Sequence, residues 1–315
     1  MVHIRELTAP PPNLDAFVRE IADELQRLYG AAAAERYRLR GRSVLQATLM
    51  HPAVSGWGAF LDGVLVGLLF TVVRSTVGEL SFMHVLRSRC AQSVEDRLAQ
   101  EAVNTLRAGG VEGITSDFVP ACPLAHHQTM LDLGFEHIPR QLMRRPLPMP
   151  APPGGPAGSR PLHPADWASA ADCLAEAYAQ HPGRRLHAEV RSREEAADFF
   201  RRTVDGAYGP VRPESLRGVF RGNTCVALAL GCEASADTGF VLQFAVHPEA
   251  RGQGLGTRLL HELLAAFGQA GLANAALGVS MANPARRLYA RVGFQPFREI
   301  DAYAWWRGEL KETLE

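Results

Sequence analysis

Residues 239–271 read GFVLQFAVHPEARGQGLGTRLLHELLAAFGQAG, and the rest of the chain can be interpreted outward from them. Phe240 to Val246 is nearly all apolar and rich in Val and Phe, which predicts a strand covered on both faces. Pro248 ends that strand, because proline has no backbone N–H to donate. After a turn at residues 251–256, leucines recur at helical spacing until Gly271. The stretch therefore predicts a strand, a glycine-rich turn and an amphipathic helix.

The turn carries Arg251 and then glycines at alternate positions, Gly252, Gly254 and Gly256. Glycine has no Cβ, so the backbone can approach a ligand closely. The first turn of a helix also presents unpaired N–H groups and a partial positive charge. Together with Arg251, these features predict a cradle for a pyrophosphate. The spacing fits neither a P-loop nor a dinucleotide fingerprint, and a glycine-rich turn without a ligand is the alternative.

A second motif follows from Asn283 to Phe294, with the pattern N-x-A-x-x-L-Y-x-x-x-G-F. Preceded by A-V-H-P-x-x-R-G-Q-G-L-G at residues 245–256, it closely resembles the GNAT superfamily of N-acetyltransferases in order and separation. The resemblance implies an α/β (α+β) fold with a mixed, mostly antiparallel sheet flanked by helices. It also implies acetyl-CoA as the acyl donor, and an enzyme that transfers the acetyl group directly to an amine.

The same resemblance implies which residues bind acetyl-CoA. The strand before the turn pairs with the pantetheine arm through its backbone, and the turn holds the pyrophosphate. The implied coenzyme residues are Phe244, Ala245, Val246, Arg251, Gly252, Gln253, Gly254, Leu255, Gly256, Thr257, Asn283 and Arg286. Asn283 before Pro284 is also a suitable N-cap, and both roles can coexist. No metal is expected, since the histidines have no ligand spacing.

Tyr289 is the candidate acid for the departing thiolate, because it falls at the family's usual tyrosine position. A tyrosine pKa near 10 suits donation to a thiolate whose conjugate acid lies around 8.5. The alternative is a tyrosine whose ring only packs beside Leu288 and Phe294. By the resemblance, a backbone N–H near Val246 would polarise the thioester carbonyl.

The general base is less well defined by the sequence. Many family members carry a glutamate on the strand before the turn, but this chain has Gln243 there. Glu233, at the end of the preceding strand, is the candidate base, directly or through water. Asp237 and His247 are weaker candidates, and each of the three also suits a solvated loop or strand end. Transfer from an already neutral amine would need no base.

The length of 315 residues suits two domains. Residues 149–161, MPAPPGGPAGSRP, are predicted to be a Pro/Gly linker that supports neither helix nor sheet ladder. It separates residues 1–148 from residues 162–315. The later half contains both motifs and is the predicted acetyltransferase domain.

The two halves share landmarks in sequence. Gly63 and Gly222 both lie in predicted hairpins, and Gly134 and Gly293 are both followed by Phe. The two pairs have the same separation along the sequence. Such long-period similarity predicts two copies of one domain. At the same offset Glu95 stands opposite Gly254, and its carboxylate would repel a pyrophosphate. The first half is therefore predicted to be a degenerate GNAT-like domain without a coenzyme site.

Composition limits the other classes of function. The formal net charge is zero, which gives no electrostatic case for nucleic acid or a membrane surface. The five cysteines form no C-x-x-C pair and suit a reducing compartment, so a cytoplasmic protein is expected. The longest apolar run, residues 64–73, is shorter than the roughly 20 residues of a membrane helix.

The acceptor is expected to be an amine of a small molecule or a peptide. The resemblance implies that it enters near residues 178–193, which are basic, and residues 301–306, which are aromatic; a solvated helix and a packed strand are the alternatives. A non-catalytic acyl-CoA sensor or interaction module is the alternative function. A tandem pair can mimic the family's dimer within one chain, so a monomer or a homodimer is expected.

Overall fold

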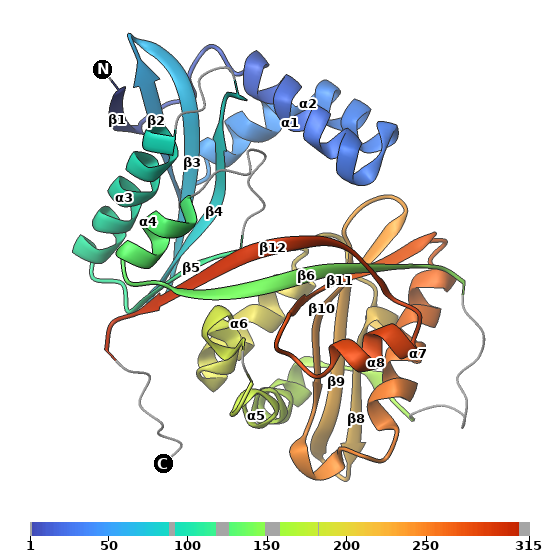
Figure 1. The fold of residues 1–315 in the computed structure, drawn as a ribbon. Helices are drawn as coiled ribbons and strands as arrows, with labels where there is room; N and C mark the ends of the chain where they lie inside the picture. The colour runs from blue at the N-terminus through green and yellow to red at the C-terminus, as the bar shows by residue number, and fades with distance from the viewer. Residues whose placement is uncertain (1, 88–91, 118–125, 149–157, 182, 309–315) are drawn as a thin grey trace. The chain divides into compact units, whose positions relative to one another are not determined.

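We describe the fold from a computed structural model (Figure 1). It describes residues 2–87, 92–117, 126–148, 158–181 and 183–308. The chain forms two compact units, Met1–Ile138 with Ile300–Glu315, and Pro139–Glu299. Each unit is described by itself below.

The first unit is a mixed sheet with helices. Its strands follow the order β1-β2-β3-β4-β5-β12, and only β4 and β5 pair in parallel. The strands are β1 (Val2–Leu7), β2 (Val54–Leu61), β3 (Val64–Arg74), β4 (Val77–Val85), β5 (Gly113–Ser116) and β12 (Gln295–Trp306). The helices are α1 (Asp15–Tyr29), α2 (Ala31–Leu49), α3 (Gln92–Ala108) and α4 (His126–Asp132).

The second unit repeats this plan. Its strands follow the order β7-β8-β9-β10-β11-β6, and only β10 and β11 pair in parallel. The strands are β6 (Glu136–Pro146), β7 (Arg160–Pro161), β8 (Leu216–Arg221), β9 (Thr224–Glu233), β10 (Thr238–Val246) and β11 (Asn274–Ser280). The α-helices are α5 (Trp167–Tyr178), α6 (Arg193–Val204), α7 (Leu255–Gln269) and α8 (Arg286–Arg291). The expected α/β fold with mostly antiparallel sheets is confirmed.

The repeat extends to irregularities of the sheet. Each hairpin, β2–β3 and β8–β9, has a register shift, at Ala59/Phe60 and at Val219/Phe220. The expected hairpin at Asp62 and Gly63 is present, and both residues have positive φ. Because bulges re-aim side chains, their recurrence at matching places indicates two copies of one architecture.

The two units exchange their last strands. β6, from the first half of the chain, pairs with β11 from Arg140 to Pro146. β12, from the second half, pairs with β5 from Tyr303 to Trp306. The division expected at residues 149–161 therefore differs from the compact units, because each half donates its final strand to the other half's sheet.

The expected linker also differs at its end. Residues 149–157 lie outside the described residues, but Arg160 and Pro161 form β7 and pair with β8. The sequence predicts no strand at these two residues, because proline cannot donate a hydrogen bond to a ladder. β7 is the outermost strand of its sheet, so the missing N–H of Pro161 is tolerated.

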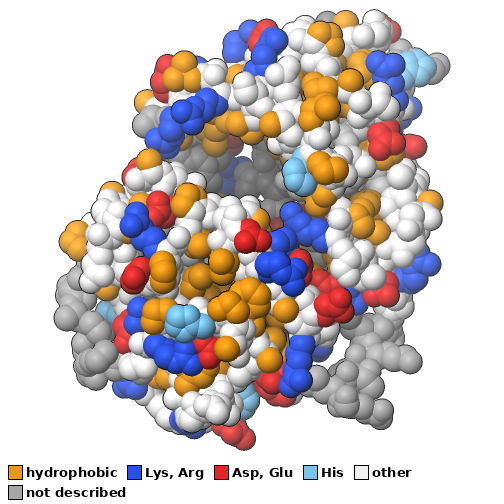
Figure 2. All heavy atoms as spheres, turned by 180° about the vertical axis from the view of Figure 1, so that it is seen from behind, with side chains coloured by type: hydrophobic (Ala, Val, Ile, Leu, Met, Phe, Trp, Pro, Cys, Tyr) orange, Lys and Arg blue, Asp and Glu red, His pale blue; other side chains and the backbone are white. Residues whose placement is uncertain are grey.

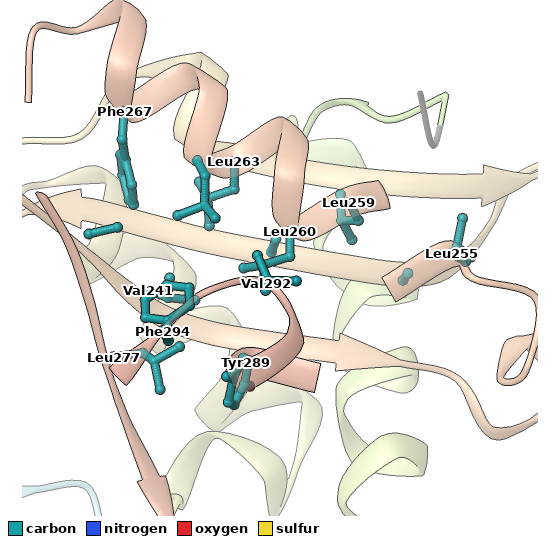
Figure 3. Close-up of a cluster of buried hydrophobic side chains, with 14 of the residues drawn as sticks. Val241, Leu255, Leu259, Leu260, Leu263, Phe267, Leu277, Tyr289, Val292 and Phe294 are labelled. Atoms are coloured by element: carbon teal, nitrogen blue, oxygen red, sulfur yellow. The ribbon is translucent and has the colours of Figure 1, made fainter. Parts of the chain in front are cut away.

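Helices cover both faces of the second unit's sheet. On one face, α7 buries a stripe of leucines and Phe267 against Val241 and Leu277 of the strands (Figure 3). On the other, α5 and α6 pack Leu174, Phe199 and their neighbours against β9. The stripe has the helical spacing predicted from sequence, and each fully buried leucine contributes about 1.5–3 kcal/mol of stability.

Charged side chains of both signs lie on the face of the molecule drawn in Figure 2. Figure 2 shows basic and acidic side chains interspersed over one side of the molecule. Among the described residues, no helix combines the length and apolar character that a membrane span requires.

Candidate functional site: a cavity where β10 and β11 separate

A cavity of about 650 Å³ lies in the second unit, beside the ends of β10 and β11. The parallel pairing of these strands runs from Thr238↔Asn274 to Val241↔Leu277. Beyond that point both strands line the cavity, together with the end of α5, the helix α8 and Arg140 of β6. Strands that separate leave backbone groups without a ladder partner, which suits an extended ligand that needs main-chain hydrogen bonds.

A bulge in β10 determines which side chains reach each face. The register against β9 shifts between Val241 and Gln243. Val241 and Phe244 consequently pack in the same cluster below α7, although residues three apart in a regular strand face opposite sides. The same shift directs Gln243 toward Tyr178 of α5, whose hydroxyl donates a hydrogen bond to it.

The glycine turn leads from β10 into α7. Gly252 and Gly254 have φ values of +76° and +68°, a conformation that side chains with a Cβ rarely adopt. Gly254 is the N-cap of α7 and supplies no side-chain cap. The first backbone N–H groups of α7, from Leu255 to Thr257, therefore lack helical acceptors, as an anion cradle requires.

Gly256 lies where α7 packs against β10. A Cβ at this position would lie 3.2 Å from Val246 and 3.4 Å from Phe244. The residue is glycine because α7 packs tightly on β10. Gln253, in the turn, accepts a hydrogen bond from Arg221 at 2.9 Å.

Arg251 lies at the rim of the cavity. Its guanidinium donates to the carbonyl oxygens of Val246 at 3.2 Å and Ala177 at 3.0 Å. These bonds hold a positive charge where the end of α5 meets the end of β10. The structure thus brings together Phe244, Ala245, Val246 and Arg251 along one side of the cavity.

Tyr289 projects from α8 and lines the cavity. It is 7% exposed, and its ring contacts those of Phe244 and Phe294 edge-on. Burial raises the pKa of Tyr289 above its ordinary value. Within the described part of the chain its hydroxyl makes no hydrogen bond, so the proton-bearing group remains available to a ligand.

Asn283 and Arg286 occupy different environments. Asn283 lines the cavity, and its side-chain oxygen accepts the N–H of Ala285 at 2.8 Å. Arg286 donates to the carbonyl of Met281 at 2.9 Å and to Gln141 at 3.1 Å, and it is not among the cavity residues. The structure therefore brings Asn283 to the site and gives Arg286 a position beneath it.

The three residues considered as bases are not among those that line the cavity. Glu233 forms an ion pair with Arg212 at 2.7 Å. Asp237 accepts hydrogen bonds from its neighbours in a loop, and His247 accepts the N–H of Glu249. None of the three is among the side chains that line it. Residues 301–306, expected near the acceptor, belong instead to β12 in the first unit.

A polar network that the sequence did not reveal lies beside the cavity. Gln243 is 2% exposed, accepts from the Tyr178 hydroxyl at 2.8 Å, and donates to the carboxylate of Glu189. Nδ1 of His187, which lines the cavity, lies 3.1 Å from the same carboxylate. The sequence identifies Gln243 only as the place where a glutamate is missing. A buried glutamine needs hydrogen-bond partners, and this need is the one signal that could have pointed to a carboxylate elsewhere in the chain.

The electrostatics of this network favour an ionised Glu189. Burial pushes the pKa of Glu189 upward, but the charge and hydrogen bond of His187, with further hydrogen bonds, outweigh it and lower the pKa. His181, also in the cavity wall, behaves differently. Burial, together with the positive charges of His187, Arg140 and Arg251, lowers the pKa of His181 to about 4, so its imidazole is neutral near pH 7.

Arg140 is a cavity residue that comes from the first half of the chain. A Cβ on Gly278 of β11 would lie 2.9 Å from its guanidinium, so the glycine leaves room for this side chain. Burial lowers the pKa of Arg140. In the described residues, no cluster of three or more side chains could hold a metal ion.

Comparison with known proteins agrees with this geometry. Residues 173–294 match the Acetyltransferase (GNAT) family. The range contains the cradle, the strands that separate and Tyr289. No curated protein matches the chain in sequence.

Solved structures show the same fold over nearly the whole chain. A GCN5-related N-acetyltransferase from Sphaerobacter thermophilus is 18% identical, with a TM-score of 0.66, and the match covers 97% of this chain and 95% of that one. A tandem GNAT protein from the clavulanic acid biosynthesis pathway, described as being without AcCoA, is 16% identical, with a TM-score of 0.58 and coverage of 98% and 99%. A glucosamine N-acetyltransferase region of a fungal β-N-acetylglucosaminidase is 13% identical, with a TM-score of 0.64 and coverage of 97% and 38%.

At these identities the solved structures establish the fold, and the match to the family model covers residues 173–294. The members of that family are N-acetyltransferases that take an acyl group from acyl-CoA. Residues 173–294 thus match the Acetyltransferase (GNAT) family, and solved GNAT acetyltransferases, among them a tandem GNAT protein, share the fold of nearly the whole chain.

Proposed function

We propose that the protein is an acetyl-CoA-dependent N-acetyltransferase that acetylates an amine of a small molecule or a peptide. The observation that carries the proposal is one cavity whose lining includes both Arg251, the first residue of the glycine turn, and Tyr289. The separated backbone of β10 lines the same cavity, and the free N–H groups at the start of α7 follow Arg251 in the chain. This sequence of groups suits a pyrophosphate followed by an extended amide-bearing arm.

The proposed roles of the residues follow from their positions. Bound acetyl-CoA would supply the thioester whose carbonyl carbon the amine attacks. Gly252, Gly254 and the start of α7 would hold the pyrophosphate, and the end of β10 would pair with the arm. Tyr289 would donate a proton to the sulfur, since its hydroxyl is unbonded and burial keeps it protonated. Holding amine and thioester in contact removes the need for a covalent enzyme intermediate.

We propose no coenzyme site in the first unit. Its third helix, α3, already begins at Gln92, so Glu95 lies within the helix and is 1% exposed. The position that corresponds to Gly254 is thus neither a turn nor open to a ligand. The proposed stoichiometry is one acetyl-CoA per chain, in a monomer or a homodimer. The free, buried thiols of Cys173, Cys225 and Cys232 support a cytoplasmic location.

Calorimetric titration with acetyl-CoA tests the proposal. One site per chain is expected, and Arg251→Glu is expected to weaken binding about 10- to 100-fold, because charge-assisted hydrogen bonds are lost and repulsion replaces them. Arg19→Glu, the same charge change on α1 of the first unit, is the control and should leave affinity unchanged. Two sites, or equal losses in both variants, would contradict the proposed cradle.

A non-catalytic acyl-CoA sensor is the second candidate, favoured by Gln243 at the position of the family's strand glutamate. Both candidates bind acetyl-CoA, and turnover separates them. Release of coenzyme A in the presence of a panel of primary amines, followed with a thiol reagent, is expected for the enzyme and absent for the sensor.

A further inference from the structure

The network at Gln243 contains a histidine–carboxylate pair that faces the cavity. Nδ1 of His187 lies 3.1 Å from Oε1 of Glu189 and 3.2 Å from the side-chain nitrogen of Gln243. The Gln243 side chain is fixed at its other end by the Tyr178 hydroxyl. Its amide nitrogen donates to the same Glu189 carboxylate. The carboxylate thus has two donors directed at it, and one of them is the imidazole.

This arrangement selects a tautomer of His187. A carboxylate accepts hydrogen bonds, so Nδ1 of the neutral imidazole carries the proton and donates it to Glu189. Nε2 then bears the lone pair. Among the residues that the structure describes, none hydrogen-bonds to Nε2, and the ring is part of the cavity wall. A ring nitrogen with a free lone pair in a substrate cavity can accept a proton.

We infer that His187 is the general base of the proposed reaction, and that Glu189 and Gln243 are the residues that position it. The inference rests on the proposed N-acetyltransferase function. Glu189 reaches the site from the segment between α5 and α6, and Gln243 connects it to β10. The strand position that carries a glutamate in many family members is Gln243 here. In this proposal the carboxylate comes from Glu189, and it acts on the acceptor through His187.

The proton balance is as follows. An acceptor ammonium gives one proton to Nε2 of His187, and the neutral amine attacks the thioester carbonyl carbon. The C–N bond forms and the C–S bond breaks, while the sulfur takes the proton of the Tyr289 hydroxyl. The second proton of the former ammonium restores that hydroxyl, and His187 releases its proton to solvent. The net products are the amide, free coenzyme A and one proton.

Several titratable groups surround His187 and enter any pH dependence. Tyr178, the last residue of α5, and His181, in the segment after that helix, face it with ring centroids 5.1 Å and 6.5 Å away. Glu189 lies on its own segment, and Arg140 of β6 interacts electrostatically with Tyr178, His181 and Glu189. A neutral His181 and a fixed Arg140 do not change charge near pH 7, so Glu189→Gln isolates the carboxylate's effect on His187.

The first test needs no acceptor. Nitrogen-15 NMR of histidine-labelled protein reports the tautomer of each imidazole, and His187→Gln assigns the resonances of His187. The protonated Nδ1 tautomer is expected in the intact protein, with that preference lost in Glu189→Gln, whose side chain has the same shape. A protonated Nε2 in the intact protein would overturn the inference, whether or not any variant folds.

The second test is kinetic, using acetyl-CoA and the amine found by the screen. His187→Gln is expected to lower kcat/KM for the amine by at least about 100-fold, with the KM of acetyl-CoA unchanged. The acidic limb of the pH profile should disappear in His187→Gln, because the group that accepts the proton is absent. His3→Gln, at an exposed site on β1, is the control.

The outcomes separate the two proposals. Absence of acetyl-CoA binding in calorimetry would refute the proposed function itself. Normal binding and turnover with an unchanged pH profile in His187→Gln would leave that function standing and refute the assignment of the base.

Discussion

Tyr289 is the residue that we propose as the acid for the departing thiolate. It is buried at 7% exposure, its ring is fixed by Phe244 and Phe294, and its hydroxyl has no hydrogen bond within the described residues. Because burial raises its pKa above 10, the neutral, proton-bearing form persists throughout the physiological range. A tyrosine that only packed would need no such access to the cavity.

Removing the Tyr289 hydroxyl tests this role. Tyr289→Phe keeps the ring contacts and is expected to lower kcat about 100-fold or more while the KM of acetyl-CoA stays constant, because the hydroxyl acts in the transition state. Steady-state kinetics with the screened amine measure it. Since the pKa is raised, the intact enzyme should show no alkaline loss of this acid at pH 10. Full activity of the phenylalanine variant would remove Tyr289 from the mechanism.

At the scale of elements, the turn between β10 and α7 combines strain with binding. Gly254 and Gly271 flank α7, and both have positive φ with no atom closer than 3.7 Å to an added Cβ. Alanine at either position is therefore expected to cost a similar 1–2 kcal/mol of unfolding free energy, about the cost of a left-handed residue.

This similarity makes Gly271→Ala a matched control for Gly254→Ala. Only Gly254→Ala is expected to weaken acetyl-CoA binding, because only that position lies in the cradle. Chemical denaturation measures the stabilities and calorimetry the affinities. Equal affinities in the two variants would show that the turn does not hold the coenzyme.

The sequence allows the helices and strands of the site to be predicted, but not the side-chain contacts between them. The β10–turn–α7 stretch has a strong periodicity and a specific motif, so the strand, the glycine turn and the helix could be predicted. Gln243 was identified by position, but its partner Glu189 could not be, because the bulge that aims Gln243 at Tyr178 leaves no trace in hydrophobic alternation. Arg286 has the family's residue type but contacts Gln141 of a strand that the sequence assigned to the other domain.

At the scale of the whole molecule, the exchange of β6 and β12 determines which residues form each compact unit. The second unit, Pro139–Glu299, is continuous in sequence and includes β6 with Arg140 and Gln141. A segment that starts just before β7, residues 158–315, lacks that strand and leaves the edge of β11 unpaired. An exposed strand edge favours aggregation, and Arg286 would lose a hydrogen-bond partner.

Two fragments test this definition. Residues 136–299 are expected to be monodisperse and to bind acetyl-CoA, whereas residues 158–315 are expected to aggregate or to bind at least about tenfold more weakly, because a cavity wall is missing. Size-exclusion chromatography and calorimetry measure both properties. Equivalent behaviour of the two fragments would show that β6 is dispensable to the second unit.

The exchanged strands also constrain the order in which the chain can fold during synthesis. The sheet of the first unit is completed by pairs such as Ser116 with Tyr303, whose partners are separated by the entire second unit. Such distant pairing is slow, and the edge of β5 stays open until the ribosome has released β12. The second unit, whose strands are consecutive from β6 to β11, can mature earlier. The half that lacks the family's motifs would then be the last to reach its native state.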